Sequence, residues 1–356
     1  MMRNYKEIRI GNVRIGADNP IAVQSMCNVP FSRFDELKTQ ALQLQNAGCD
    51  ILRVSVPDED SARLFRELKR TLSIPLVADI HFSYKLALAS IDAGADKIRI
   101  NPGNLERDKI RVVADAARKA GIPIRVGINS GSLEKRLLAK YGSPTAAALA
   151  ESALDNVKLL EDCDFSDIAV SIKSSDVRLT VEAYKAFDEL NVNRYPLHIG
   201  VTEAGTLRTG LIKGSAGIGA LLLQGIGSTI RYSLTADPIE EIHAAKTLLR
   251  ALGLNDTGIE VISCPTCGRT TVDSVRLANR IETEFSHIKK HLKIAVMGCV
   301  VNGIGEAREA DFGVTGANGL YVLFQKAGDG TVKILRDKIR EDEIFSVIEK
   351  QIQSML

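Results

Sequence analysis

From Ile21 onward, two patterns of apolar and polar residues alternate along the chain. Short runs rich in Ile, Leu and Val alternate with stretches in which apolar residues recur at three- and four-residue spacing. The first pattern is typical of buried strands and the second of helices that bury one face. Their repetition indicates βα units and a parallel sheet. The expected strands begin near Ile21, Ile51, Leu76, Lys97, Ile124, Ile168, Leu197 and Thr229.

This rhythm predicts an α/β fold with an N-terminal (β/α)8 TIM barrel, because eight βα units fill about 250 residues in that fold. Three expected helices end at Ala-Gly directly before a strand, at 47–48, 93–94 and 120–121. Glycine there supplies the left-handed cap. A doubly wound open sheet would have fewer strands and a glycine fingerprint after the first, which the sequence lacks. A hairpin turning at Gly11 and Asn12 is expected before the barrel.

The pattern changes after a helix expected over Pro238 to Leu252. We therefore predict two domains: the barrel at 1–254, and a smaller C-terminal α+β domain at 255–356. The elements expected in the second domain are strands at Ile259–Ser263 and Ile294–Met297, a helix at Ser274–Lys290, a hairpin of Phe312–Phe324 and Val332–Leu335, and a final helix from Glu341.

Polar residues occupy one parity of most expected barrel strands. Successive side chains on a strand point to opposite faces, so one parity meets the helices and the other meets the barrel interior. Polar residues near the carboxyl ends of the strands are expected in an active site. The interior rows hold the cations Arg53, Arg99, Arg125, Lys173 and Arg231, the acids Asp79 and Glu203, and the further polar residues His81, Asn101, Asn129, Ser171, His198, Thr202, Thr229 and Ser233.

This interior row carries five cations against two acids. Buried charges without partners are costly, so the surplus predicts an anionic, phosphorylated substrate bound by guanidinium groups. A solvated barrel mouth with structural ion pairs is the alternative. The stretch from Gly210 to Leu221 is expected to form a loop before a helix, which would add backbone N–H groups for phosphate.

Single residues in the row admit more than one role. Glu203 is the best candidate for general acid–base catalysis, since it follows Thr202 at the barrel mouth. Lys173 fits a phosphate clamp, although a Schiff-base lysine is an alternative. His81 and His198 suit ligand contacts and satisfied core positions equally well.

Three cysteines of the C-terminal part have the spacing of metal ligands. Cys264 and Cys267 are separated by two residues, Cys299 follows later, and Glu306 is the nearest hard ligand that could complete the set. An incomplete cysteine set suits an iron–sulfur cluster with one special iron. A closed zinc site and unligated core cysteines remain alternatives. The isolated cysteines, expected to be inert in the core, are Cys27, Cys49 and Cys163.

Overall charge and hydropathy exclude some partners. Lys and Arg total 46 against 44 Asp and Glu, so no global field favours nucleic acid or an anionic membrane. No apolar run approaches the roughly 20 residues of a membrane helix. With no signal peptide and with its remaining cysteines occurring singly, the sequence predicts a protein of the reducing cytoplasm.

Three motifs together resemble one enzyme family. They are Ser263–Arg269 (SCPTCGR), Met297–Glu306 (MGCVVNGIGE) and His198–Gly205 (HIGVTEAG). The chain resembles the 4-hydroxy-3-methylbut-2-enyl diphosphate synthase family, also called IspG or GcpE, over essentially its full length and in the short bacterial form. No ligand position departs from the family pattern.

The resemblance implies a two-electron reduction of 2-C-methyl-D-erythritol 2,4-cyclodiphosphate in the non-mevalonate isoprenoid pathway. It implies a [4Fe–4S] cluster on Cys264, Cys267, Cys299 and Glu306, with flavodoxin or ferredoxin as electron donor. By the same analogy the barrel residues clamp the diphosphate and Glu203 handles a proton. The family also implies a head-to-tail homodimer in which one subunit's cluster covers the other's barrel.

Two competing functions remain at this point. One is a zinc-stabilised barrel that performs aldol or pterin-type chemistry on a phosphorylated substrate, with Lys173 or Asp79 at its centre. The other is a zinc-ribbon binding module joined to an inactive barrel, with nucleic acid as partner. Balanced charge and few aromatic residues near the cysteines disfavour the second.

Overall fold

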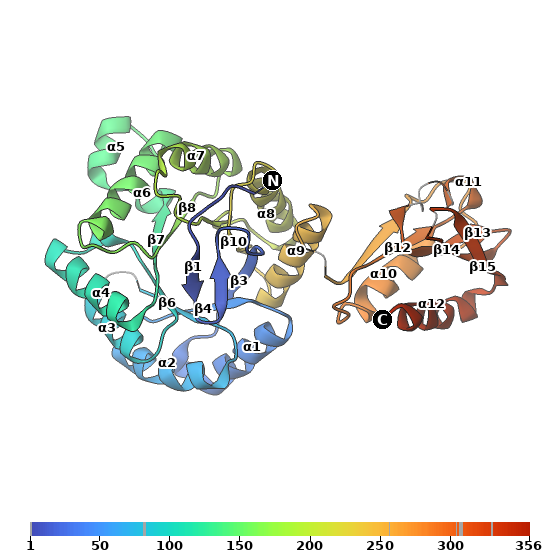
Figure 1. Cartoon of the computed structure of the whole chain (residues 1–356), viewed down its shortest axis with the longest axis horizontal. Helices are drawn as coiled ribbons and strands as arrows, with labels where there is room; N and C mark the ends of the chain where they lie inside the picture. The colour runs from blue at the N-terminus through green and yellow to red at the C-terminus, as the bar shows by residue number, and fades with distance from the viewer. Residues whose placement is uncertain (1, 81–82, 256, 304, 306–308, 329) are drawn as a thin grey trace. The chain divides into compact units, whose positions relative to one another are not determined.

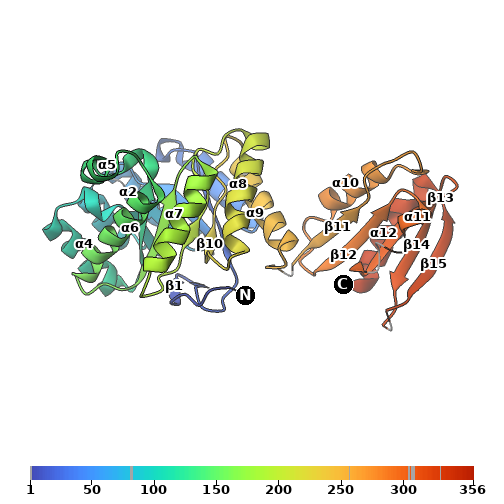
Figure 2. The same cartoon turned by 90° about the horizontal axis from the view of Figure 1, so that it is seen from above.

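A computed structural model of the 356-residue chain describes residues 2–80, 83–255, 257–303, 305, 309–328 and 330–356. The chain forms two compact units, Met1–Asn255 and Asp256–Leu356. Figures 1 and 2 show the elements of each unit.

The first unit is a barrel of parallel strands ringed by helices, which confirms the predicted fold (Figure 1). Its strands run in the order β8-β7-β6-β5-β4-β3-β10-β9. A parallel bridge between Val170 and Leu197 joins the two ends of that order. The strands are β3 (Ala22–Met26), β4 (Ile51–Ser55), β5 (Leu76–Asp79), β6 (Lys97–Ile100), β7 (Ile124–Asn129), β8 (Ile168–Lys173), β9 (His198–Ile199) and β10 (Thr229–Ile230).

The helices bury the apolar parity of the strands. Leu52 and Val54 of β4 and Ile98 of β6 are at most 1% exposed within this core. The helices are α1 (Phe34–Asn46), α2 (Glu59–Thr71), α3 (Tyr84–Asp92), α4 (Arg107–Ala120), α5 (Lys135–Tyr141), α6 (Ala146–Glu161), α7 (Val177–Leu190), α8 (Leu207–Leu222) and α9 (Pro238–Ala251), with short 3-10 turns η1 (Phe31–Arg33), η2 (Pro102–Asn104) and η3 (Ser130–Ser132).

The expected N-terminal hairpin is present and lies at one end of the barrel (Figure 2). It consists of β1 (Ile8–Ile10) and β2 (Val13–Ile15), paired antiparallel. Its isoleucines form an apolar cluster with interior residues near the starts of the barrel strands: Ala22, Ile51, Val77 and Ala169. This end of the barrel is therefore apolar, and the polar interior row faces the carboxyl ends of the strands.

The glycine-rich stretch from Gly210 to Leu221 is not a phosphate-binding loop, so that prediction is wrong. It lies inside α8, which begins at Leu207. Its glycines instead allow the helix to approach the barrel closely. A Cβ at Gly210 would lie 2.5 Å from Leu234 Cδ2, and one at Gly217 would lie 2.6 Å from Val201 Cγ2.

Replacing Gly214 by alanine is expected to destabilise the barrel, although alanine favours helices. The new Cβ would lie 2.6 Å from two ring atoms of Tyr232, a buried side chain whose hydroxyl is 2.7 Å from Ser215 Oγ. Overpacking costs about 1–3 kcal/mol, more than the roughly 1 kcal/mol gained in helix propensity. Thermal unfolding followed by circular dichroism should show a lower midpoint.

Gly219 of the same helix offers a matched control for this substitution. A Cβ there would meet Leu248 Cδ1 at 3.8 Å, an ordinary contact. Gly219→Ala should leave the midpoint unchanged or raise it. Equal destabilisation by both substitutions would contradict the close-packing explanation.

The second unit is an α+β domain built on one sheet, ordered β11-β12-β13-β14-β15. The first three strands are parallel neighbours, and the last two pair antiparallel. The strands are β11 (Ile259–Ser263), β12 (Leu292–Met297), β13 (Phe312–Ala317), β14 (Leu320–Lys326) and β15 (Val332–Ile339), and the helices are α10 (Ser274–Glu284), α11 (Val300–Gly303) and α12 (Glu341–Met355). Residues of α10 and α12 share one core with the sheet, including Ile281, Ile294, Val314 and Ile348.

Two details of this unit differ from the sequence prediction. The segment Phe312–Phe324 is not one strand, because it turns at Asn318 and Gly319, which have φ values of 52° and 77°. An Asn-Gly pair with positive φ at both positions is the preferred two-residue hairpin turn. The helix α10 ends at Glu284, before the expected Lys290.

Candidate functional site

A polar cavity of about 100 Å³ opens among the carboxyl ends of the barrel strands. Its lining comes from the interior row that strand parity predicts. Nine of the eleven proposed binding residues line it, and Ser171 adds a tenth; the nine are Arg53, Asp79, Arg99, Arg125, Asn129, Lys173, Thr202, Arg231 and Ser233.

Two other predicted residues, Asn101 and Glu203, do not line this cavity. Asn101 is buried, and its side chain accepts a hydrogen bond from the Gly103 N–H at 3.2 Å, which caps η2. Glu203 is exposed beside Thr202 and has a left-handed backbone, with φ of 50°. His81 lies outside the described residues.

Asp79 is the acid at the centre of the cavity and is shared by two arginines. Its oxygens lie 3.7 Å from Arg53 Nη2 and 3.4 Å from Arg99 Nη1. Arg99 also donates from Nη2 to the carbonyl oxygen of Gly127 at 3.2 Å. One carboxylate thus contacts two guanidinium groups.

Two charged residues near the cavity escaped the sequence analysis. Glu241 of α9 is 3% exposed and pairs with Arg231. Lys97 of β6 is fully buried, with Nζ 3.5 Å from Gln24 Oε1. Strand parity could have found Lys97, which shares the interior row of Arg99; no pattern in the sequence marks Glu241.

Cations outnumber acids among the described side chains of this region. The cations are Arg53, Lys97, Arg99, Arg125, Lys173 and Arg231, and the acids that pair with them are Asp79 and Glu241. Burial, and then the neighbouring positive charges, hold the pKa values of Lys97 and Lys173 well below 10.5. The unliganded cavity is therefore electrostatically unfavourable, and an anion would relieve it.

His198 is a neutral partner of Lys173 within the barrel. Burial first, and then the charge of Lys173, keep its pKa well below 6.5. Its Nε2 lies 3.3 Å from Lys173 Nζ and its Nδ1 lies 2.8 Å from Thr229 Oγ1. With Nε2 accepting from the ammonium group, Nδ1 carries the proton that it donates to Thr229. This geometry makes His198 a support for Lys173.

Arg125 lies deepest among the arginines of the cavity, 2% exposed. Burial, followed by the charges of Arg53 and Arg99, lowers its pKa from 12.5. Its Nε is buried without a hydrogen-bond partner among the described residues. A buried guanidinium with unused donors is suited to an anionic ligand with several oxygen atoms, such as a diphosphate.

The C-terminal cysteines lie where two neighbouring parallel strands end. Ser263 of β11 pairs with Val296 of β12, so the segments carrying Cys264 and Cys299 leave the same edge of the sheet. The Gly298 N–H donates to Cys264 Sγ at 3.2 Å. Cys267 is exposed in the loop between them.

The thiols of the chain fall into two chemical groups. The pKa of Cys267 is lowered, chiefly by a hydrogen bond from the Arg269 backbone N–H and also by the positive charge of Arg269. Burial raises the pKa of Cys27 and Cys49 to about 12 and also raises that of Cys163. Thiolates are the metal-binding form, so the exposed loop is suited to ligation and the core thiols are inert.

No group of three His, Cys, Asp or Glu side chains close enough to hold a metal ion occurs among the residues that the structure describes. The proposed fourth ligand, Glu306, lies outside them. The three cysteines nevertheless fit thiolate ligation, since two follow adjacent strand ends and both Cys264 and Cys267 accept backbone N–H···S bonds.

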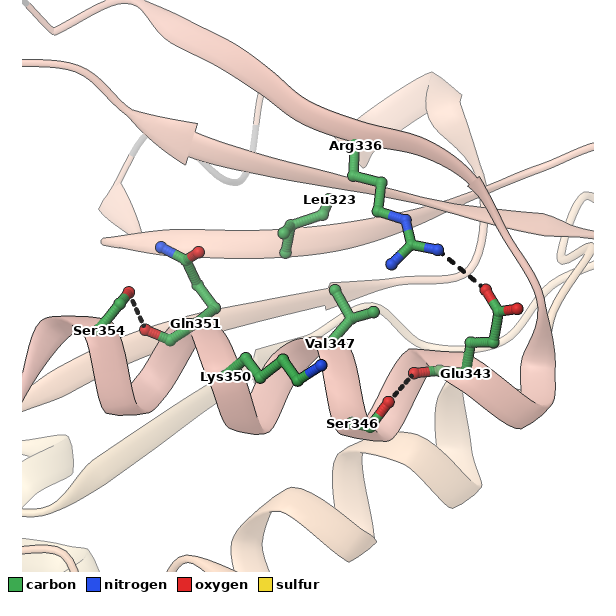
Figure 3. A pocket seen from close by; sticks show the side chains of 8 residues that line it. All are labelled: Leu323, Arg336, Glu343, Ser346, Val347, Lys350, Gln351 and Ser354. Carbon is green, nitrogen blue, oxygen red and sulfur yellow. Dashed lines mark hydrogen bonds and ion pairs between the residues drawn. The ribbon is translucent and has the colours of Figure 1, made fainter.

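A second groove of about 280 Å³ lies on the C-terminal unit between β15 and α12 (Figure 3). Its polar groups largely engage each other. Arg336 Nη2 lies 3.0 Å from Glu343 Oε2, and Ser346 donates to the Glu343 carbonyl oxygen at 2.9 Å. None of the three cysteines lines this groove, so it is separate from the candidate site.

In the part of the chain that the structure describes, no helix has both the length and the apolar character needed to cross a membrane.

Solved structures that resemble the barrel share its fold at low sequence identity. Dihydropteroate synthase from Stenotrophomonas maltophilia is 14% identical, with a TM-score of 0.51, and the match covers 69% of this chain and 98% of that one. The Yersinia pestis dihydropteroate synthase is 12% identical at a TM-score of 0.51, covering 70% and 99%. These similarities support the barrel fold alone.

Family models and curated relatives cover nearly the whole chain. Residues 5–246 match the GcpE TIM-barrel domain and residues 260–354 match the GcpE protein C-terminal domain. A relative from Caldanaerobacter subterraneus, named 4-hydroxy-3-methylbut-2-en-1-yl diphosphate synthase (flavodoxin), is 53% identical over 99% of both chains. The Bacillus subtilis protein of the same name is 49% identical over 98% of this chain and 90% of its own. The chain therefore belongs to the GcpE family of 4-hydroxy-3-methylbut-2-en-1-yl diphosphate synthases.

Proposed function

We propose that this enzyme converts 2-C-methyl-D-erythritol 2,4-cyclodiphosphate to (E)-4-hydroxy-3-methylbut-2-enyl diphosphate, a step of the non-mevalonate isoprenoid pathway. The substrate takes up two electrons and two protons. The ring C–O bond to phosphate breaks, and one hydroxyl group leaves as water. The observation that carries the proposal is the excess of buried cations around the barrel cavity. Such an excess of buried cations favours a polyanionic ligand.

The chain's own side chains would bind and orient this substrate. The diphosphate oxygens would be bound by Arg53, Arg99 and Arg125, since guanidinium groups bind such oxygens in bidentate fashion. Lys173, held by His198, would add a point charge. Glu203, next to Thr202 in the sequence, would supply a proton to the departing hydroxyl.

The electrons would enter through a [4Fe–4S] cluster held by Cys264, Cys267, Cys299 and Glu306. When bound, this cluster supplies single electrons beside the substrate. The relatives' names specify flavodoxin, so we propose a flavodoxin as donor, with ferredoxin as the alternative. Such a cluster and its donor suit the reducing cytoplasm.

Metal analysis of anaerobically purified protein tests the cluster. We expect near four irons and four acid-labile sulfides per chain. One zinc with no sulfide, persisting after anaerobic reconstitution with iron and sulfide, would instead support a zinc-stabilised barrel. The same analysis of Glu306→Ala tests the proposed fourth ligand.

We also propose that the site is completed across a head-to-tail homodimer, with the cluster of one subunit covering the barrel of the other. A mixed dimer of Arg99→Ala and Cys299→Ser subunits should then regain part of the activity that each parent lacks, because one intact barrel meets one intact cluster. Absence of recovery in verified heterodimers would count against shared sites.

Binding of inorganic pyrophosphate should draw protons onto two lysines at pH values between their pKa values in the free and the bound protein. Burial and neighbouring cations lower the pKa of Lys97 and Lys173, and a bound anion offsets those charges and raises both values. Calorimetry in buffers of different ionisation enthalpy should detect net uptake, reduced in Lys173→Met. Pyrophosphate binding without uptake would contradict this account.

The same lysines give the unliganded barrel a pH-dependent stability. Their pKa values are lower when folded than when unfolded, so the unfolded chain binds more protons between the two values. Stability should therefore rise as pH increases through that window.

A further inference from the structure

Arg231 is held at the cavity by the carboxylate of Glu241, which lies on a helix outside the ring of strands. The residue follows β10, and its Nε donates to Glu241 Oε2 at 3.2 Å while its Nη2 donates to Glu241 Oε1 at 3.2 Å. The two parallel bonds form a side-on fork, the most directional arrangement for an arginine and a carboxylate. Glu241 is 3% exposed and lies in the first turn of α9.

Other donors fix Glu241 itself. Ser25 Oγ of β3 donates to Oε2 at 2.9 Å, and the Leu234 backbone N–H donates to Oε1 at 3.2 Å. The positive end of the helix dipole further favours a carboxylate in the first turn of α9. The carboxylate is thus anchored from three elements and has little freedom to rotate.

This anchoring determines which donors Arg231 offers to a ligand. A guanidinium group has five N–H bonds in a planar fork. The fork to Glu241 takes one from Nε and one from Nη2, which leaves the Nη1 side of the group. Nη1 itself makes only a long hydrogen bond, to Met26 Sδ at 3.7 Å, and Arg231 lines the cavity.

We propose that Glu241 is a positioning residue that orients Arg231 to bind one phosphate of the anionic substrate. This inference rests on the proposed function and adds to it a residue that never touches the ligand. Glu241 lowers the net positive charge of the site, so it would weaken anion binding if charge alone mattered. Positioning and charge therefore predict opposite effects of its removal.

The test measures the dissociation constant of inorganic pyrophosphate by calorimetry on the full chain. Glu241→Gln keeps the shape but presents an amide N–H to one of its donors, which disrupts the fork. We expect binding about tenfold weaker at moderate salt. Glu240→Gln, the same change in the same helix turn, should bind as the unsubstituted protein does.

A double-mutant cycle separates positioning from general damage. In an Arg231→Ala background, Glu241→Gln should not weaken binding, because no guanidinium remains to be oriented and loss of the carboxylate charge favours the anion. Ser25→Ala, which removes one anchor and keeps the charge, should weaken binding by a few-fold in the presence of Arg231 and have no effect in its absence.

The outcomes distinguish this inference from the proposed function. If the unsubstituted protein binds no pyrophosphate, the proposal that the barrel cavity binds an anion is itself wrong. If it binds and Glu241→Gln binds equally or more tightly, the site stands and positioning by Glu241 is overturned. If Glu241→Gln fails to fold, Ser25→Ala in the two backgrounds decides the question.

Discussion

Replacing Arg125 by methionine is expected to impair catalysis severely while making the unliganded enzyme more stable. Arg125 is 2% exposed, and burial together with the charges of Arg53 and Arg99 disfavours its ionised form in the fold. A methionine of similar length removes that charge and fills the space. A buried charge without a paired acid is costly, so an apolar side chain in its place is expected to stabilise the fold.

The loss of catalysis also follows from removing the Arg125 guanidinium group. Losing one member of a buried, hydrogen-bonded charge pair costs about 2–5 kcal/mol in binding. We therefore expect kcat/KM to fall by about 30- to 4,000-fold. Steady-state kinetics and thermal unfolding of the same preparation measure both effects, and the midpoint should rise by roughly 3 °C.

Arg63 provides the control for this pair of measurements. Its side chain is 78% exposed and pairs with Asp60 within α2. Arg63→Met should change kcat/KM less than twofold, since exposed pairs contribute little. Unchanged catalysis in Arg125→Met would contradict the role given to the buried arginine, and a large loss of stability would contradict the electrostatic explanation.

Replacing Cys299 by serine is expected to abolish the reductase activity and remove most of the bound iron. Cys299 follows β12, beside the strand end that leads to Cys264, so as a proposed ligand it would connect the two loops. A serine hydroxyl stays protonated where a thiolate would bind iron. Iron and sulfide analysis after anaerobic purification should show loss of the cluster, with activity reduced at least about 10³-fold.

Cys163 is the matched control for loss of a thiol. It is 6% exposed and its Sγ lies 3.4 Å from the Leu159 carbonyl oxygen in the barrel. Cys163→Ser should retain iron and activity. Retention of iron and sulfide in Cys299→Ser, at the unsubstituted level, would show that Cys299 is not a ligand.

The parts of the fold that the sequence predicts are those that local patterns determine. The alternation of side chains along each strand is enough to assign Arg53, Arg125 and Lys173 to one interior row, because parity is a property of neighbouring residues. The apolar periodicity of the helices marks where each strand begins. The hairpin at Gly11 and Asn12 follows from its turn residues.

Of the two charged residues missed, Lys97 could have been assigned to the interior row by strand parity, but its burial and the pairing of Glu241 depend on contacts between distant segments. Lys97 begins a strand, where a lysine usually reaches water, but the N-terminal hairpin seals that end of the barrel with isoleucines. Glu241 lies in the first turn of a helix, where acids are common for reasons unrelated to Arg231. Its role needs the approach of α9 to β10, which no local pattern encodes.

The glycine-rich segment of α8 shows that closely spaced glycines in a sequence can have two physical causes. Glycine permits loops that bind phosphate, and it also permits a helix to pack without a Cβ. The distance from Gly214 to Tyr232 favours the second cause here. The choice depends on what lies opposite each glycine, which only the folded chain determines.

The most direct test of the central claim is turnover of the cyclic diphosphate by the cluster-loaded protein. Anaerobic enzyme, reduced flavodoxin and 2-C-methyl-D-erythritol 2,4-cyclodiphosphate would be mixed and the products identified by mass spectrometry and phosphorus NMR. The account predicts the linear allylic diphosphate, formed in proportion to enzyme with two electrons consumed per molecule. Return of unchanged cyclic diphosphate, from protein shown to contain the cluster and to bind the substrate, would contradict it.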